Sequence, residues 1–180
     1  MHVTPTLFWL TGLSGSGKTT LGLLLTEELR AQGHSVIFLD GDVLRELYNN
    51  CFGHERDERL VASLQYARLC KFLLAQGVHV VCSTISLFHK TQIWNRENIS
   101  RYIEIFLDVS LPELIERDNK GIYSRGLKGE LKNIVGVDIQ PEFPMHPDLI
   151  IRNAQGSSVI DHVRLILQYI AADLKPVFLN

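Results

Sequence analysis

The chain has 180 residues, of which 46% are hydrophobic and 21% charged, and its formal net charge at pH 7 is −2. This length allows one domain with a sizeable core, and the composition excludes a disordered protein and a membrane-embedded one. A net charge near zero gives no general attraction to nucleic acid, and the lack of a basic leader or a long apolar run favours a cytoplasmic location.

Short apolar runs alternate with longer stretches of helical composition. The runs are bounded by glycine or polar residues, which is typical of strands buried on both faces of a parallel sheet. The alternation predicts an α/β fold over residues 1–180, with helices on both faces of the sheet and ligands at the carboxyl ends of the strands. The expected strands are 7–10, 36–39, 78–82, 102–107 and 149–151, and the expected helices are 19–32, 58–76, 111–117 and 157–174.

Between Lys120 and Pro147 the pattern changes to glycine, proline and charged residues, over a length that is unusual for an inert connection. We expect a mobile lid over the ligand site. Lys120, Arg125 and Lys128, with Arg117 just before them, could close over a phosphoryl group during transfer. A solvated charged face is the alternative interpretation.

The segment GLSGSGKT matches the phosphate-loop motif G-x-x-x-x-G-K-[ST]. Its glycines let successive backbone N–H groups turn inward around phosphates, and its position between an expected strand and helix is the context the motif requires. Lys18 would reach the β- and γ-phosphate oxygens and act in catalysis, while Thr19 would bind Mg²⁺. A flexible turn without a ligand is the alternative. The predicted ATP-binding residues are Gly12, Ser14, Gly15, Ser16, Gly17, Lys18, Thr19, Thr20 and Arg117.

Two carboxylates follow the second expected strand, at the same sheet edge as the phosphate loop. One of Asp40 and Asp42 could help Thr19 to hold Mg²⁺, and the other could accept the proton of an attacking hydroxyl. Because Asp-Gly is a common turn dipeptide, a solvated turn is the alternative. A kinase interpretation follows if both carboxylates face the phosphate loop.

The chain resembles the adenylylsulfate kinase family, P-loop enzymes that phosphorylate the ribose 3′-hydroxyl of adenosine 5′-phosphosulfate. The resemblance covers nearly the whole length and rests on GLSGSGKTT, LDGDVLR, STIS, ERDNKGIYSRGLKGE and GVD. It implies a homodimeric kinase that uses ATP and Mg²⁺ on a small nucleotide, with Asp42 as catalytic base, Asp40 as the alternative base, and Asp40 with Thr19 at the metal. The acceptor-binding residues that it implies are Asp42, Arg45, His54, Arg59, Ser86 and Lys120.

The departures from the family pattern cluster where the acceptor nucleotide would lie. An asparagine and an arginine that usually follow Arg59 in the family are replaced by Ala62 and Gln65. Two phenylalanines that sandwich adenine in the family correspond to His54, with Phe52 close by, and to Ile134 in the lid. Fewer aromatic faces weaken stacking on a purine.

Two acceptors therefore stay open. Adenosine 5′-phosphosulfate comes first because it is the acceptor of the family that the chain resembles. Cytidine diphosphoramidate is a close second. It is the acceptor of a related group of kinases in bacterial capsule modification, and its smaller base suits a less aromatic site. A regulatory ATP-binding module is a further alternative, which the polar acceptor-side residues disfavour. A GTP-binding switch would need an N-K-x-D segment, and residues 118–121 read DNKG instead.

Overall fold

The computed structural model describes residues 4–118, 120–154 and 156–173 and contains a five-stranded parallel sheet with the strand order β2-β3-β1-β4-β5. The strands are β1 (Leu7–Thr11), β2 (Val36–Asp40), β3 (His79–Ser83), β4 (Tyr102–Leu107) and β5 (Leu149–Ile151). The helices are α1 (Lys18–Ala31), α2 (Gly41–Leu47), α3 (Arg56–Ala75), α4 (His89–Asn98), α5 (Leu111–Arg117), α6 (Ile122–Leu127) and α7 (Val159–Asp173).

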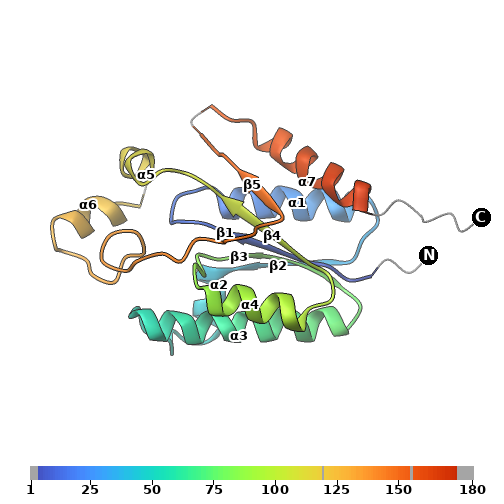
Figure 1. The fold of residues 1–180 in the computed structure, drawn as a ribbon, viewed down its shortest axis with the longest axis horizontal. Coiled ribbons are helices and arrows are strands. Elements are labelled where there is room, and N and C mark those ends of the chain that lie inside the picture. The colour runs from blue at the N-terminus through green and yellow to red at the C-terminus, as the bar shows by residue number, and fades with distance from the viewer. Residues whose placement is uncertain (1–3, 119, 155, 174–180) are drawn as a thin grey trace, which may run out of the picture.

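The helices form layers on the two faces of the sheet. α1 and α7 cover one face, and α2, α3 and α4 cover the other (Figure 1). α5 and α6 lie beyond the carboxyl ends of the strands, at the end of the molecule where the loop between β1 and α1 also lies. The α/β fold predicted from the alternation of apolar runs is confirmed.

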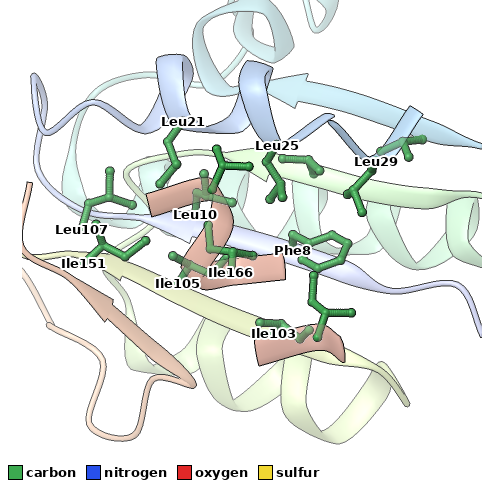
Figure 2. Packing of buried hydrophobic residues seen from close by; sticks show 14 residues of the cluster. Phe8, Leu10, Leu21, Leu25, Leu29, Ile103, Ile105, Leu107, Ile151 and Ile166 are labelled. Atoms are coloured by element: carbon green, nitrogen blue, oxygen red, sulfur yellow. The ribbon is translucent and has the colours of Figure 1, made fainter. Parts of the chain in front are cut away.

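The central strand β1 contributes to both cores because successive side chains of a strand point to opposite faces. Phe8 and Leu10 pack with α1 and α7, whereas Leu7 and Trp9 pack with α2 and α3. Figure 2 shows the first of these clusters, in which leucines spaced one turn apart on α1 meet the isoleucines of β4. All of β1 is buried, so the phosphate loop that follows it starts from a fixed point.

Truncation of Leu25 should destabilise the fold strongly. Leu25 is fully buried between α1 and the sheet, and Leu25→Ala removes apolar contacts and leaves a cavity, which typically costs about 2–5 kcal/mol. Leu23→Ala on the exposed side of the same helix, where 45% of the residue is accessible, should cost less than about 0.5 kcal/mol. Urea unfolding of both variants measures the difference, and equal losses would contradict the assigned core.

Most of the predicted elements are confirmed, with boundaries that differ by one or two residues. The strand expected to end at Leu39 includes Asp40, and the third strand covers His79–Ser83 instead of 78–82. The last helix begins at Val159 instead of Ser157, and its predicted end, Leu174, lies outside the described residues. Three helices, α2, α4 and α6, were not predicted. Within the described ranges, no helix combines the length and apolar character needed to cross a membrane.

The segment expected to be a lid consists of two different parts. Its first part contains α6, whose Tyr123 packs into a buried cluster with Leu13 and Leu87, and its second part packs Ile134, Val135 and Ile139 into the same cluster. The second part is therefore attached to the body of the protein by apolar contacts. α6 is attached in the same way, so a movement of this segment over the site stays a prediction.

Candidate active site

A cleft of ≈ 590 Å³ lies at the carboxyl ends of the central strands. Residues from the phosphate loop, the starts of α2 and α3, the segment after β3 and the predicted lid line it together. These segments are far apart in the sequence, so the fold is what brings their polar groups to one place. The predicted site residues that line the cleft are Ser14, Gly15, Gly17, Lys18, Thr19, Thr20, Asp40, Asp42, Arg45, His54, Arg59, Ser86, Arg117 and Lys120.

Two other predicted residues, Gly12 and Ser16, are buried under the loop. Gly12 has a φ of 152°, and a Cβ atom there would come within 2.7 Å of the Leu107 carbonyl oxygen. Gly12 therefore lets the loop pass closely over the end of β4. Ser16 accepts a hydrogen bond from the Lys18 Nζ atom at 3.3 Å, so both residues shape the loop from below.

Lys18 is held inside the loop that it belongs to. Its Nζ atom donates a hydrogen bond of 2.6 Å to the Leu13 carbonyl oxygen, and only 9% of the residue is exposed. Burial lowers the pKa of Lys18 to about 8, while the carboxylates of Asp40 and Asp42 act in the opposite direction. Because Lys18 begins α1, its ammonium group adds to the positive end of that helix. This end of the cleft is suited to phosphate groups.

Asp40 and Asp42 lie beside the phosphate loop but in different environments. Asp40 is the N-cap of α2: one carboxylate oxygen accepts from the Asp42 backbone N–H at 2.9 Å, and the other accepts from the Thr19 hydroxyl at 2.8 Å. The Asp42 side chain is largely exposed and pairs with the Lys120 ammonium at 2.9 Å. Asp40 and Thr19 thus present adjacent oxygen atoms, whereas the Asp42 carboxylate is exposed in the cleft and paired with Lys120.

Two residues that sequence reasoning missed fix the phosphate loop from above. The Asn153 side-chain amide donates to the Ser16 carbonyl oxygen at 2.9 Å, and the Tyr123 hydroxyl donates to the Ser14 carbonyl oxygen at 2.8 Å. Burial raises the pKa of Tyr123 to about 12, with the Asp118 carboxylate acting in the same direction, so the hydroxyl keeps its proton. Asn153 lies two residues after the end of β5, and its place near a strand end was the available signal for it.

Arg117 belongs to the same layer above the loop. Its guanidinium donates to the Glu113 carboxylate at 2.6 Å and to the Asn153 carbonyl oxygen at 2.7 Å. The first contact lies within α5, and the second connects α5 to the segment after β5. Arg117 therefore lines the cleft as a fixed side chain, held by its contacts with Glu113 and with the Asn153 carbonyl oxygen.

The opposite end of the cleft contains two arginines held by backbone carbonyl groups. Arg45 donates to the carbonyl oxygens of Phe52 and Gly53, and Arg59 donates to those of His54 and Asn133 at 2.7 and 2.8 Å. The partners in these four contacts are neutral carbonyl oxygens, which do not neutralise the positive charges of Arg45 and Arg59 as a carboxylate would. This end of the cleft can therefore attract an anion.

The remaining acceptor-side residues lie around these arginines. Burial lowers the pKa of His54, and the positive charges of Arg45 and Arg59 lower it further, which favours the neutral imidazole. Ala62 and Ile134 line the same cleft. The Ser86 and Thr84 hydroxyl oxygens lie 2.9 Å apart. Phe52, close to His54 in the sequence, packs against Tyr48 and Tyr66 and is not among the residues that line the cleft.

Comparison with known proteins finds relatives that match most of this chain. The family model described as adenylylsulphate kinase matches residues 4–152. The chain is similar to a cytidine diphosphoramidate kinase of Campylobacter jejuni, with 40% identity over 171 residues that cover 95% of this chain and 99% of that protein. It is also similar to a probable adenylyl-sulfate kinase of Aeropyrum pernix, with 37% identity over 158 residues, 86% of this chain and 85% of that one.

Solved structures show the same relationship. An APS kinase of Mycobacterium tuberculosis, determined in complex with AMPPNP and APS, matches with a TM-score of 0.86 at 27% identity and covers 93% of this chain and 98% of that one. The family model spans more than half of the chain, and the relatives are phosphotransferases by name. This chain belongs to the adenylylsulphate kinase family and is a kinase.

Proposed function

We propose that this protein transfers the γ-phosphoryl group of ATP to the ribose 3′-hydroxyl of a nucleotide with a modified 5′-phosphate. One observation carries the proposal: a single cleft has a phosphate loop with Lys18 at one end and the paired arginines Arg45 and Arg59 at the other. Two anion-binding ends in one cleft suit two nucleotides whose reacting groups meet between them.

The ATP end would use the phosphate loop together with Mg²⁺. Thr19 and Asp40 fit the metal because they supply hard oxygen atoms 2.8 Å apart beside the loop, and Mg²⁺ is usually held by one or two such ligands plus substrate phosphates. The metal would neutralise phosphate charge during transfer. Lys18 would bind the β- and γ-phosphate oxygens, with Arg117, Tyr123 and Asn153 keeping the loop in shape.

The acceptor end would orient the attacking hydroxyl. Arg45 and Arg59 would hold the 5′-phosphates, Ser86 and His54 would contact the nucleoside, and Lys120 would approach the phosphates from the lid. Asp42 would accept the proton of the 3′-hydroxyl. Its pairing with Lys120 is between exposed groups, and such pairs contribute only about 0–1 kcal/mol, so a substrate hydroxyl can replace it.

For the acceptor we favour cytidine diphosphoramidate over adenosine 5′-phosphosulfate. His54 and Ile134 stand where the resemblance places two phenylalanines, and both line the cleft together with Ala62. Less aromatic surface suits a pyrimidine better than a purine. The relative named for cytidine diphosphoramidate is 40% identical along almost the full length of both chains. Capsule modification would then be the pathway.

Adenosine 5′-phosphosulfate is the second candidate, and sulfate assimilation would then be the pathway. It is supported by the Aeropyrum pernix relative, named as a probable adenylyl-sulfate kinase. The Mycobacterium tuberculosis structure that contains APS has nearly the same fold. The retained residues Arg45, Arg59 and Ser86 suit either acceptor.

A kinetic comparison of the two acceptors tests the proposal. With saturating ATP and Mg²⁺, we expect kcat/KM for cytidine diphosphoramidate to exceed that for adenosine 5′-phosphosulfate by about tenfold or more, since one lost aromatic contact alone is worth roughly 0.5–1.5 kcal/mol. The reverse preference would select the second candidate. Turnover of neither compound, with ATP still bound, would favour a regulatory ATP-binding module. Light scattering of the same preparation tests the expected homodimer.

A further inference from the structure

The acceptor end of the cleft contains a buried hydroxyl group without a hydrogen-bond partner. Tyr66, on α3, lines the cleft, yet only 4% of the residue is exposed. Among the described residues that line this cleft, Tyr66 alone has a buried side-chain polar atom that no protein group satisfies. A buried, unpaired hydroxyl is unfavourable in the folded protein and needs an explanation.

The Tyr66 ring is held firmly by its neighbours. Its centroid lies 6.0 Å from the Tyr48 ring and 6.4 Å from the Phe52 ring, which it meets edge to face. These contacts fix the direction of the hydroxyl, although they satisfy none of its hydrogen-bonding capacity. A fixed polar group of this kind is prepared for a ligand before the ligand arrives.

Arg45 and Arg59 line the same cleft as Tyr66, and Arg59 precedes Tyr66 by about two turns of α3, on the same face of the helix. Burial raises the pKa of Tyr66, while the positive charge of Arg45 acts in the opposite direction. Burial lowers the pKa of Arg59 and the charge of Arg45 lowers it further, whereas Tyr66 acts in the opposite direction. One helical turn before Tyr66, the small side chain of Ala62 lines the cleft and leaves room for a ligand group there.

We propose that the Tyr66 hydroxyl hydrogen-bonds to the 5′-terminal group of the acceptor nucleotide, beside Arg45 and Arg59, and thereby helps to select the acceptor. This inference rests on the proposed function. Guanidinium groups only donate hydrogen bonds, whereas a hydroxyl both donates and accepts. A terminal phosphoramidate has N–H groups that need an acceptor, and a terminal sulfate has none. Tyr66 therefore adds the hydrogen-bonding capacity that the arginines lack.

Tyr66→Phe removes the hydroxyl and keeps the ring. In steady-state assays, KM for cytidine diphosphoramidate should rise about tenfold or more, because hydrogen bonds in charged surroundings are the stronger ones. KM for ATP, and kcat, should change less than about twofold. Without nucleotides the variant should melt at or above the wild-type temperature, because an unpaired buried group has been removed. Tyr48→Phe, which changes a neighbouring ring in the same aromatic cluster, is the matched control and should leave all three constants unchanged.

Cytidine diphosphate serves as a second acceptor, since an oxygen replaces the amide nitrogen at its terminus. A larger KM increase for the phosphoramidate than for cytidine diphosphate supports the inference, whereas an equal or smaller increase contradicts a role of Tyr66 in selecting the acceptor. An unchanged KM for both acceptors in Tyr66→Phe overturns the inference, and so does the same KM increase in Tyr48→Phe. Failure of the wild-type protein to phosphorylate any acceptor would instead contradict the proposed function, so the two failures are distinguishable.

Discussion

Lys18→Ala should reduce phosphoryl transfer by about 10²–10³-fold or more, the range seen when a group that stabilises transition-state charge is removed. The Lys18 ammonium lies in the phosphate loop with its pKa lowered only to about 8, so it is mostly charged at pH 7. Its hydrogen bonds to Leu13 and Ser16 are local to the loop. The variant should therefore fold normally, with a cooperative melting transition and unchanged circular dichroism.

The matched control for this variant is Lys71→Ala. Lys71 is exposed on α3, where its ammonium contacts Asn98 and the Trp94 ring outside the cleft. Initial rates of ADP formation at saturating acceptor measure both variants. Near-normal turnover of Lys18→Ala, or an equal loss in Lys71→Ala, would remove Lys18 from the catalytic machinery.

Asp42→Asn should lower turnover by about 10²–10⁴-fold, the usual contribution of a general base, and should leave ATP affinity nearly unchanged. The change is almost isosteric and affects an exposed carboxylate, so the fold should persist. Asp40→Asn alters a carboxylate that contacts Thr19 and caps α2. This variant should instead need more Mg²⁺, and excess Mg²⁺ should restore part of its rate.

Turnover across a magnesium series, with ATP affinity measured in parallel, separates the two roles. If Asp42→Asn is rescued by Mg²⁺ while Asp40→Asn loses turnover without rescue, the two assignments must be exchanged. If neither change matters, the proposed kinase mechanism fails. Melting temperatures of both variants control for the loss of the α2 cap in Asp40→Asn, which can cost about 0.5–2 kcal/mol.

The sequence predicted the five strands and four of the helices in the described residues, and missed α2, α4 and α6. α4 was missed because its buried face consists of Thr91, Gln92 and Asn95, so no apolar periodicity marks it. α2 has only seven residues and begins with the glycine of an apparent Asp-Gly turn; the Asp40 side chain stabilises its start. Both helices depend on tertiary or capping contacts that a hydropathy pattern does not reveal.

The site divides in a similar way. The phosphate-loop residues and the two carboxylates could be predicted because a motif and a strand end specify them. Asn153 and Tyr123 could not be predicted, because they contact the phosphate loop across sequence separations of 137 and 109 residues. Tyr66 could not be predicted either, because only the structure shows that its buried hydroxyl has no hydrogen-bond partner. Phe52, which is close to His54 in the sequence, packs against Tyr48 and Tyr66, a contact that the sequence pattern did not indicate.

The central claim is that one cleft holds ATP and a nucleotide acceptor so that the ribose 3′-hydroxyl is phosphorylated. Its most direct test is the ³¹P and ¹H NMR spectrum of the product formed by the wild-type protein from ATP, Mg²⁺ and cytidine diphosphoramidate. We predict a new phosphomonoester coupled to the ribose H3′ proton, with the 5′-diphosphoramidate intact. A phosphate attached at any other position, or no phosphorylated product with either candidate acceptor, would contradict the account.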